Sequence, residues 1–265
     1  MAKRSLKKRR KRRIKRVITL LLVSAFIILI TRPDFIPQVK QLFFHSGEER
    51  ITFKESKSRL SEYSVFGLDV SEYQDVIVWK KLDHQEDLDF VFIRASAGKD
   101  KRDRYYSYNW RETGRVGMIR GAYHYYRPDE NSIEQANNFI RQVELSSGDL
   151  PPVLDIEDYS EIQSLHRLKT GLLRWLEIVE AHYGVQPIIY TYYKFYLGHL
   201  AEDERFEKYV FWLARYGQQE KLVAPGVDWA FWQFTQTGIL PGVAGDVDLN
   251  VFRYDIASLE ALRIQ

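Results

Sequence analysis

Short apolar runs that recur between residues 65 and 252 constrain the fold of this chain more than any other feature. Eight such runs have the length of single strands, and several of them end on a polar residue. Segments with helical spacing separate the earlier runs, whereas loops rich in Gly and Pro separate the later ones. This alternation predicts an α/β fold: a single irregular (β/α) barrel of about eight strands, with helices reduced in its second half. The runs are Val65–Val70, Asp89–Ala95, Met118–Tyr126, Pro152–Glu157, Pro187–Tyr192, Val210–Ala214, Ala230–Phe234 and Val247–Phe252.

Four segments have the sequence pattern of helices. In Glu161–Tyr183 leucines recur every three or four residues, and Gly184 follows as a helix stop. A helix beginning at Ser132 has the pattern of a capping box, with Gln135 three residues after the cap. Two shorter helices are expected over Tyr106–Arg115 and Ile256–Arg263.

The fourth apolar run leads into two acids, Asp155 and Glu157. Side chains two residues apart on a strand share a face, so these carboxyls lie together while Leu154 and Ile156 face the other way. Carboxyls about 6–7 Å apart suit acid–base chemistry, because each raises the proton affinity of the other. In α/β barrels the chemistry takes place at the carboxyl ends of the strands, where this pair falls. The alternative is a strand end with two solvated acids.

Other strand ends bring acidic and aromatic residues to the same end of the predicted barrel. Carboxyls for chemistry and aromatic faces for stacking on pyranose rings are typical of a sugar site. The alternatives are a hydrated Mg²⁺ or Ca²⁺ held by the acids, and aromatic side chains that pack behind the strands instead of facing the cleft. We expect no metal and no cofactor. The residues expected at the site are Asp69 and Asp248 beside the acid pair, with Tyr123, His124, Tyr190, Tyr192 and Trp232 binding the substrate.

The charge of the chain is divided unevenly. Residues 1–16 contain eleven Lys or Arg and no acid, so the formal net charge of +3 misleads. The remaining residues carry 28 basic against 36 acidic side chains, a formal charge of −8, which argues against nucleic acid as the ligand of the globular part. The absence of cysteine excludes disulfides, thiolate metal sites and a cysteine nucleophile.

An apolar segment follows the basic one. Val17–Ile30 has fourteen residues without a charge, fewer than the ~20 of a full membrane span. Because no small-residue cleavage site follows, we expect residues 17–31 to form an uncleaved membrane-anchor helix, completed by flanking residues. The positive-inside rule places residues 1–16 in the cytoplasm and the rest outside it, with a stalk over 32–64 and a single domain over 65–265. The alternatives are a cleaved signal peptide, giving a secreted protein, and a basic nucleic-acid-binding arm.

Eight motifs, in this order, resemble those of the glycoside hydrolases of family 25, which are lysozymes acting as N-acetylmuramidases. Together they cover essentially all of residues 65–253. The resemblance implies an irregular α/β barrel that hydrolyses the β-1,4 bond between N-acetylmuramic acid and N-acetylglucosamine in peptidoglycan, without a cofactor. The motifs are Gly67-Leu68-Asp69-Val70-Ser71…Gln74, Phe90-Val91-Phe92-Ile93-Arg94-Ala95-Ser96-x-Gly98, Gly121-Ala122-Tyr123-His124, Val153-Leu154-Asp155-Ile156-Glu157, Ile189-Tyr190-Thr191, Trp212-x-Ala214-x-Tyr216, Trp232-Gln233-Phe234 and Gly245-x-Val247-Asp248-Leu249-Asn250.

The resemblance also implies a role for each acid. Glu157 matches the general acid of the family, and Asp155 matches the second carboxylate of the Asp-x-Glu pair. Asp69 and Asp248 match the acids that position the substrate or stabilise positive charge. The resemblance also implies retention of configuration, with the N-acetyl group of the substrate as nucleophile.

One position departs from the family pattern. The second strand of the family usually ends Lys-Ala-Thr-Glu-Gly, whereas this chain has Ala97 in place of the Glu. The loss of this carboxylate leaves two alternatives open beside a muramidase. One is a catalytically inactive module that binds peptidoglycan, and the other is a hydrolase of another N-acetylated polysaccharide such as chitin. We expect the catalytic domain to be monomeric.

Overall fold

The computed structural model describes residues 49–82, 88–217 and 228–265. The predicted basic segment over 1–16, the predicted anchor over 17–31 and the first half of the predicted stalk lie outside the described residues. Among the described residues, no helix combines the length and the apolar character needed to cross a membrane.

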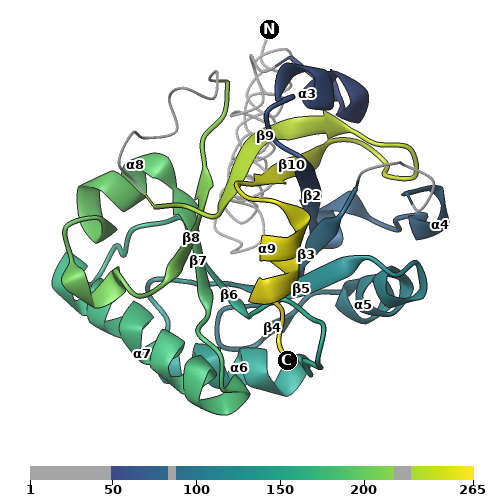
Figure 1. Cartoon of the computed structure of the whole chain (residues 1–265). Helices are drawn as coiled ribbons and strands as arrows, with labels where there is room; N and C mark the ends of the chain where they lie inside the picture. The colour runs from purple at the N-terminus through teal and green to yellow at the C-terminus, as the bar shows by residue number, and fades with distance from the viewer. Residues whose placement is uncertain (1–48, 83–87, 218–227) are drawn as a thin grey trace, which may run out of the picture. The chain divides into compact units, whose positions relative to one another are not determined.

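Eight of the described strands form a closed barrel (Figure 1). Around the barrel the order is β9, β10, β2, β3, β5, β6, β7 and β8, and β8 pairs with β9 to close the ring. Each of the eight predicted apolar runs forms one of these strands, so the prediction of an eight-stranded barrel is confirmed. The strands are β2 (Val65–Val70), β3 (Phe90–Ala97), β5 (Ile119–Tyr125), β6 (Val153–Ile156), β7 (Ile188–Tyr192), β8 (Val210–Ala214), β9 (Phe231–Ile239) and β10 (Val247–Phe252).

The last strand runs against the others. Neighbouring strands from β2 round to β9 are parallel, whereas β10 is antiparallel to both β9 and β2. The beginning of β10 therefore lies at the same end of the barrel as the carboxyl ends of the other strands. In this register Asp248 of β10 pairs with Asp69 of β2, which brings two acids from opposite ends of the sequence side by side.

Helices α5, α6 and α7 follow one another around the outside of the first half of the barrel (Figure 1). The cap of α6 is Asn131, whose side chain accepts the amide protons of Ile133 and Glu134, rather than the predicted Ser132. In the second half, the described connection from β9 to β10 contains no helix, as expected. The longer helices are α5 (Tyr106–Arg115), α6 (Ser132–Gln142), α7 (Leu165–Tyr183) and α9 (Ile256–Leu262). Shorter ones are α4 (Trp79–Leu82), α8 (Tyr193–Phe195), η1 (Glu72–Gln74), η2 (Tyr196–Leu200) and η3 (Glu204–Phe206).

The compact unit begins before the predicted domain boundary. It extends from Arg50 to the C-terminus, not from residue 65. The short strand β1 (Ile51–Thr52) pairs with β9, and helix α3 (Phe53–Arg59) follows it at once, with Thr52 forming a capping box with Glu55. Phe53 packs edge-on against Phe66 of β2. Residues 50–64 were expected in the stalk but belong to the barrel domain. The reason is that α3, a short helix in this charged segment, packs its apolar side on the sheet of the barrel.

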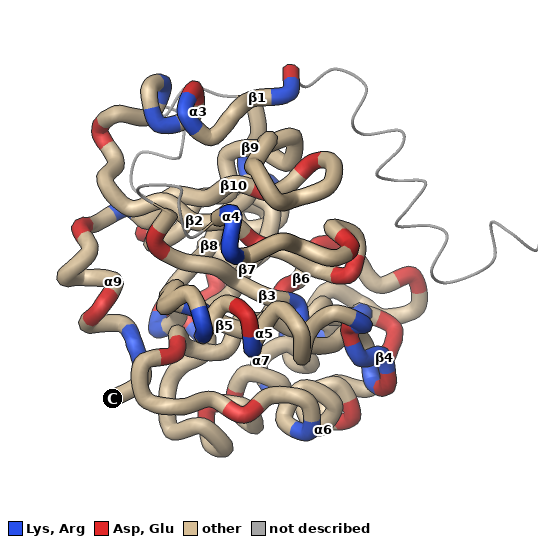
Figure 2. The backbone as a smooth tube through the Cα atoms, turned by 90° about the vertical axis from the view of Figure 1, so that its right-hand side faces the viewer, with Lys and Arg blue, Asp and Glu red and all other residues tan. Residues whose placement is uncertain are grey.

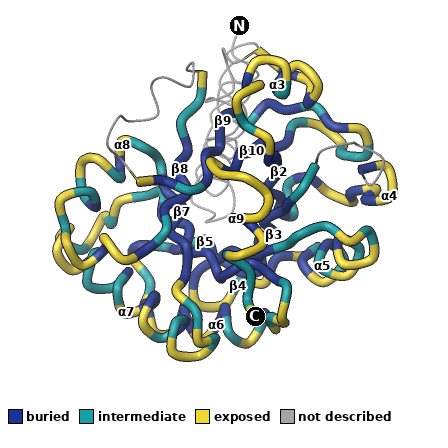
Figure 3. Tube along the Cα trace, in the orientation of Figure 1, coloured by how far each residue is buried: buried dark blue, intermediate teal, exposed yellow. Residues whose placement is uncertain are grey.

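The barrel has two apolar layers, and the strands between them are almost entirely buried (Figure 3). Lys, Arg, Asp and Glu lie mostly on the helices and loops around them (Figure 2). The inner layer is aromatic: the rings of Phe92 and Trp212 stack at 4.6 Å, and Phe90 and Phe231 both meet Phe92 edge-on. Gly67 makes room for this layer, since a Cβ there would lie 2.4 Å from the ring of Phe90. These rings fill the barrel below its mouth, so polar side chains are confined to the carboxyl end.

Candidate active site

Four carboxyl groups gather at the carboxyl end of the barrel. Asp69 lies near the end of β2, Asp155 lies near the end of β6, Glu157 follows β6 directly, and Asp248 is the second residue of β10. Asp69 and Asp155 are buried, each about 5% exposed, whereas Glu157 and Asp248 are partly exposed. The structure thus brings together all four acids expected from the sequence, with two inside the barrel and two nearer to solvent.

Asp69 lies in a dense hydrogen-bond network. Its Oδ2 accepts protons from Gln233 Nε2 at 2.7 Å and from Asn250 Nδ2 at 2.8 Å. Asp248 is also hydrogen-bonded to it through the paired side chains. Burial raises the pKa of Asp69 to about 6, although the bonds from Asn250, Gln233 and Asp248 each favour the ionised form.

Asp155 is buried without full compensation. Its Oδ1 has no hydrogen-bond partner and no contact with solvent. Burial raises the pKa of Asp155 well above its usual range, the charges of Glu157 and Asp69 raise it further, and the Arg94 guanidinium acts in the opposite direction. The acid pair on β6 therefore retains a proton to higher pH than two solvated acids would.

Tyrosines from β7 and β5 surround this pair. Tyr192 donates its hydroxyl proton to Glu157 Oε2 at 3.2 Å, and the charge of Glu157, followed by burial, raises the pKa of Tyr192. Tyr125 donates to Asp158 Oδ2 at 2.9 Å. These bonds hold the loop after β6 against the neighbouring strands at the mouth.

The other two predicted tyrosines point into the barrel. Tyr123 lies in the inner layer beside Arg94, and burial raises its pKa well above the usual range. Tyr190 donates to Gln233 Oε1 at 2.7 Å and meets Trp212 edge-on. Tyr190 is therefore first of all a structural partner of Gln233.

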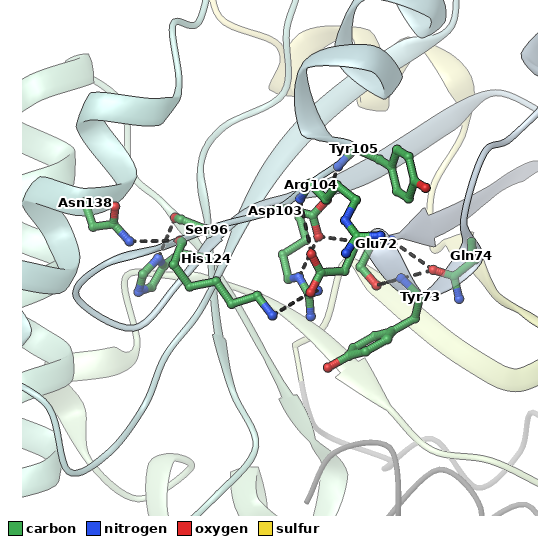
Figure 4. A network of polar contacts seen from close by, with 12 residues as sticks. Glu72, Tyr73, Gln74, Ser96, Asp103, Arg104, Tyr105, His124 and Asn138 are labelled. Carbon is green, nitrogen blue, oxygen red and sulfur yellow. Dashed lines mark hydrogen bonds and ion pairs between the residues drawn. The ribbon is translucent and has the colours of Figure 1, made fainter. Parts of the chain in front are cut away.

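The predictions that His124 and Trp232 bind substrate are wrong. His124 is completely buried on the outer face of β5, where Ser96 and Gln135 bond to its two ring nitrogens and Trp175 stacks on the ring. Figure 4 shows His124 beside Ser96. Trp232 is completely buried in the outer layer and donates its indole proton to the carbonyl oxygen of Arg215. Each is one residue out of phase with the inward positions of its strand.

A polar cluster that the sequence did not predict joins the loops after β2 and β3 (Figure 4). Arg94 Nε lies 2.9 Å from Asp103 Oδ2, and Arg94 Nη2 lies 3.3 Å from Glu72 Oε1. Asp103 also accepts the backbone proton of Glu72, and Lys101 bonds to the Glu72 carboxylate at 2.5 Å. The guanidinium of Arg94 lies 4.8 Å from the ring centre of Tyr73. The cluster fixes the loop that follows Asp69.

Ala97, which departs from the family pattern, is buried at the end of β3. Beside it a different acid lies at the rim: Glu130 accepts the backbone proton of Lys99 at 2.6 Å and pairs with Arg127 at 3.1 Å. Although Ala97 supplies no carboxylate, Glu130 from the loop before α6 places one close by. Its contacts are with the backbone and an arginine, so it serves to order the loop.

The site can perform acid–base chemistry with its carboxyl groups. Within residues 49–82, 88–217 and 228–265, no three His, Cys, Asp or Glu side chains are arranged to hold a metal ion. A closed α/β barrel with a buried and a partly exposed carboxyl on one strand end defines the class of barrel glycoside hydrolases, which cleave with paired carboxyls.

Comparison with known proteins identifies the family. The model of the glycosyl hydrolases of family 25 matches residues 68–243. The chain is 37% identical to the uncharacterized protein YegX of Escherichia coli K12, over 76% of this chain and 74% of that one. It is 34% identical to lysozyme M1 of Streptomyces globisporus, over 75% of this chain and 71% of the other. The crystal structure of a bacterial lysozyme from Streptomyces coelicolor superposes with a TM-score of 0.68 at 31% identity, covering 76% of this chain and 97% of that structure.

The chain therefore belongs to the glycosyl hydrolases of family 25 and is a glycoside hydrolase. The matched region extends from within β2 into the β9–β10 connection, and β10, with Asp248, completes the barrel beyond it.

Proposed function

We propose that this protein is a muramidase that hydrolyses the β-1,4 bond between N-acetylmuramic acid and N-acetylglucosamine in peptidoglycan. The observation that carries the proposal is the β6 strand end, where partly exposed Glu157 stands beside buried Asp155 at the open end of the barrel. The similarity to lysozyme M1 and to the Streptomyces coelicolor lysozyme supports peptidoglycan as the substrate.

In this proposal the two acids of the pair, Glu157 and Asp155, have different roles. Because burial and neighbouring charges raise the pKa of Asp155, the pair retains a proton to higher pH than two solvated acids would. Glu157 is the member open to solvent, so it delivers a proton to the glycosidic oxygen as that oxygen leaves. Asp155 then carries negative charge close to the positive charge that develops on the sugar.

The family resemblance supports one stereochemical course. We propose retention of configuration, with the N-acetyl group of the substrate attacking the anomeric carbon and water opening the resulting ring. Asp69 and Asp248 steady the positive charge from the opposite side of the mouth. The proton NMR signal of the first product anomer tests this step, since an inverting enzyme releases the other anomer.

The test of the function is digestion of purified peptidoglycan by the full chain. We expect new reducing ends and soluble muropeptides from the wild type, and a loss of about 10³-fold in Glu157→Gln, because the amide cannot donate a proton to the leaving group. Equal release by the two proteins contradicts the assignment of Glu157. Binding to peptidoglycan without any new reducing ends supports the inactive module, and faster digestion of chitin than of peptidoglycan supports the other hydrolase.

We also propose that residues 17–31 anchor the protein in a membrane with the barrel domain outside the cytoplasm. The support is the uncharged run over Val17–Ile30 after eleven basic residues. Protease added outside intact cells is expected to cut the barrel domain of the membrane-bound protein. Recovery of the protein in the soluble fraction contradicts the anchor.

A further inference from the structure

Two buried side-chain amides converge on one oxygen of Asp69. Gln233 of β9 and Asn250 of β10 both donate to Oδ2, at 2.7 and 2.8 Å. Gln233 is 2% exposed and Asn250 is completely buried, so water does not replace either donor. In the catalytic reaction proposed above neither amide has a task, yet both are held in place by further bonds.

The direction of these bonds is fixed by the partners behind them. Trp212 Nε1 lies 2.8 Å from Asn250 Oδ1, and an indole nitrogen can only donate. The oxygen of Asn250 therefore faces Trp212, and its NH₂ group faces Asp69. Behind Gln233, the hydroxyls of Tyr190 and Tyr216 both donate to Oε1, at 2.7 and 2.6 Å, which leaves its NH₂ group for Asp69.

The consequence is that Asp69 Oδ2 serves only as an acceptor. A carboxylate oxygen has two lone pairs, and two amide protons occupy both. A proton on Oδ2 would have to displace one of them and leave a buried NH₂ group without an acceptor, which is costly. The hydrogen bond between Asp69 and Asp248 must therefore use the other oxygen, Oδ1, and the proton that the two acids share lies between them.

We propose that Gln233 and Asn250 are positioning residues that keep Asp69 ionised and aim its Oδ1 at Asp248 and the cleft. The inference rests on the proposed function in one respect: the ionised Asp69 is the form that steadies positive charge on the sugar. The two amides act through Asp69 and do not touch the substrate. They oppose the effect of burial, which by itself favours the protonated acid.

The test compares Gln233→Met with the wild type by two measurements. Methionine fills the space of glutamine but donates no proton, so one bond that favours the ionised acid is lost. We expect the acidic limb of the pH profile of kcat/KM to move up by about one pH unit, the size of one hydrogen bond to a charged group. Above the shifted limb the rate is expected to return to within about threefold of the wild type, because Asp69 then ionises without the amide.

The second measurement does not depend on turnover. Titration of the Asp69 carboxyl carbon by NMR is expected to show the same upward shift in Gln233→Met. If wild-type protein releases no muropeptides, the proposed function fails, but this titration still decides the inference. An unchanged pKa of Asp69 in the variant overturns it.

The matched control is Gln135→Met, on the outer face of the barrel. Gln135 is completely buried as well and bonds to His124 and to the backbone of Arg127. This variant is expected to lose stability without any shift of the acidic limb, and an equal shift in both variants overturns the inference. If Gln233→Met fails to fold, Asn250→Ser, which withdraws the other amide from Asp69, must show the same upward shift. An Asn250→Ser protein that titrates like the wild type contradicts the proposal.

Discussion

The inner and outer faces of the same barrel strands both bury polar side chains, but they treat them differently. On the outer face, His124 has a bonding partner at each ring nitrogen and an aromatic ring on its face. On the inner face, Asp155 leaves Oδ1 without a partner in a site crowded with negative charge. His124 thus completes the packing of helices on the sheet, whereas Asp155 keeps one carboxyl oxygen unpaired at the mouth of the barrel.

The two faces also respond to pH in opposite directions. Burial lowers the pKa of His124 to about 3, so below about pH 6.5 the unfolded chain takes up a proton that the folded chain refuses, and stability falls on acidification. Burial raises the pKa of Asp69 to about 6, so the folded chain holds a proton that the unfolded chain has already lost, and stability falls as pH rises from about 4 to about 6. The predictions below separate these contributions, beginning with the largest effect.

Asp155→Asn tests whether the inner face is built for catalysis. The variant has nearly the same shape but cannot become negative, so we expect kcat on peptidoglycan to fall by about 10³-fold, roughly 4 kcal/mol of transition-state stabilisation. Because burial already disfavours the ionised form of Asp155, thermal unfolding at pH 7 is expected at the wild-type temperature or above. Kinetics and calorimetry on the same preparation measure both.

The matched control for this variant is Asp149→Asn. Asp149 is equally buried, but it pairs with Arg120 at 2.9 Å and accepts the backbone proton of Ser146. We expect lower stability and unchanged kcat. Loss of stability without loss of activity in Asp155→Asn would remove the contrast between the two faces.

His124→Leu tests the outer face. The substitution leaves the Ser96 hydroxyl without its partner and removes one of the bonds to Gln135. We therefore expect a loss of about 3 kcal/mol in the free energy of unfolding at pH 7. The sensitivity to acid between pH 6.5 and 3 is expected to shrink as well. Urea unfolding at several pH values measures both effects, and kcat at 25 °C serves as the control. A fall in kcat comparable to that of Asp155→Asn would show that His124 contributes to activity and contradict its assignment to the packing of the outer face.

The difference between the faces also explains which parts of the site the sequence could predict. The eight runs of apolar residues were sufficient to predict the barrel. The position of acids at strand ends was sufficient to predict that Asp69, Asp155, Glu157 and Asp248 lie at the same end of it. A period of two separates the faces of a strand but does not say which face is inside. His124, one residue after inward-facing Tyr123, was therefore assigned to the wrong side.

Residues that act through long-range partners were also missed. Gln233 and Asn250 meet Asp69 only because β10 lies between β9 and β2, a topology that no local pattern contains. The signal that was available is a polar residue flanked by apolar ones inside a buried strand, as in Trp232-Gln233-Phe234. Helix α3 was missed because its charged residues outnumber its two buried ones, Phe53 and Ser56.

Asp69→Asn sharpens the comparison in pH. Ionised Asp69 costs the folded state free energy that is absent below about pH 4 and fully present above about pH 6. The amide avoids this cost and still offers an oxygen to Gln233 and Asn250, so we expect about 3 kcal/mol of added stability at pH 7.5. At pH 4 the two proteins are expected to unfold at the same temperature. A stabilisation that is equal at both pH values would assign the effect to packing instead of ionisation.

Tyr192→Phe gives the smallest effect and tests how far the inner face extends towards solvent. The tyrosine donates to Glu157 at 3.2 Å, and Glu157 is partly exposed, so water takes the place of the lost hydroxyl. We expect kcat to fall three- to tenfold, about 1 kcal/mol, with little change in stability. The same substitution on the outer side, Tyr183→Phe, removes a bond to the carbonyl oxygen of Val143 at 2.8 Å and is expected to lower stability while leaving kcat unchanged. If both variants lose only stability, Tyr192 has a structural role in the barrel, and Glu157 is the outermost residue of this strand end that contributes to activity.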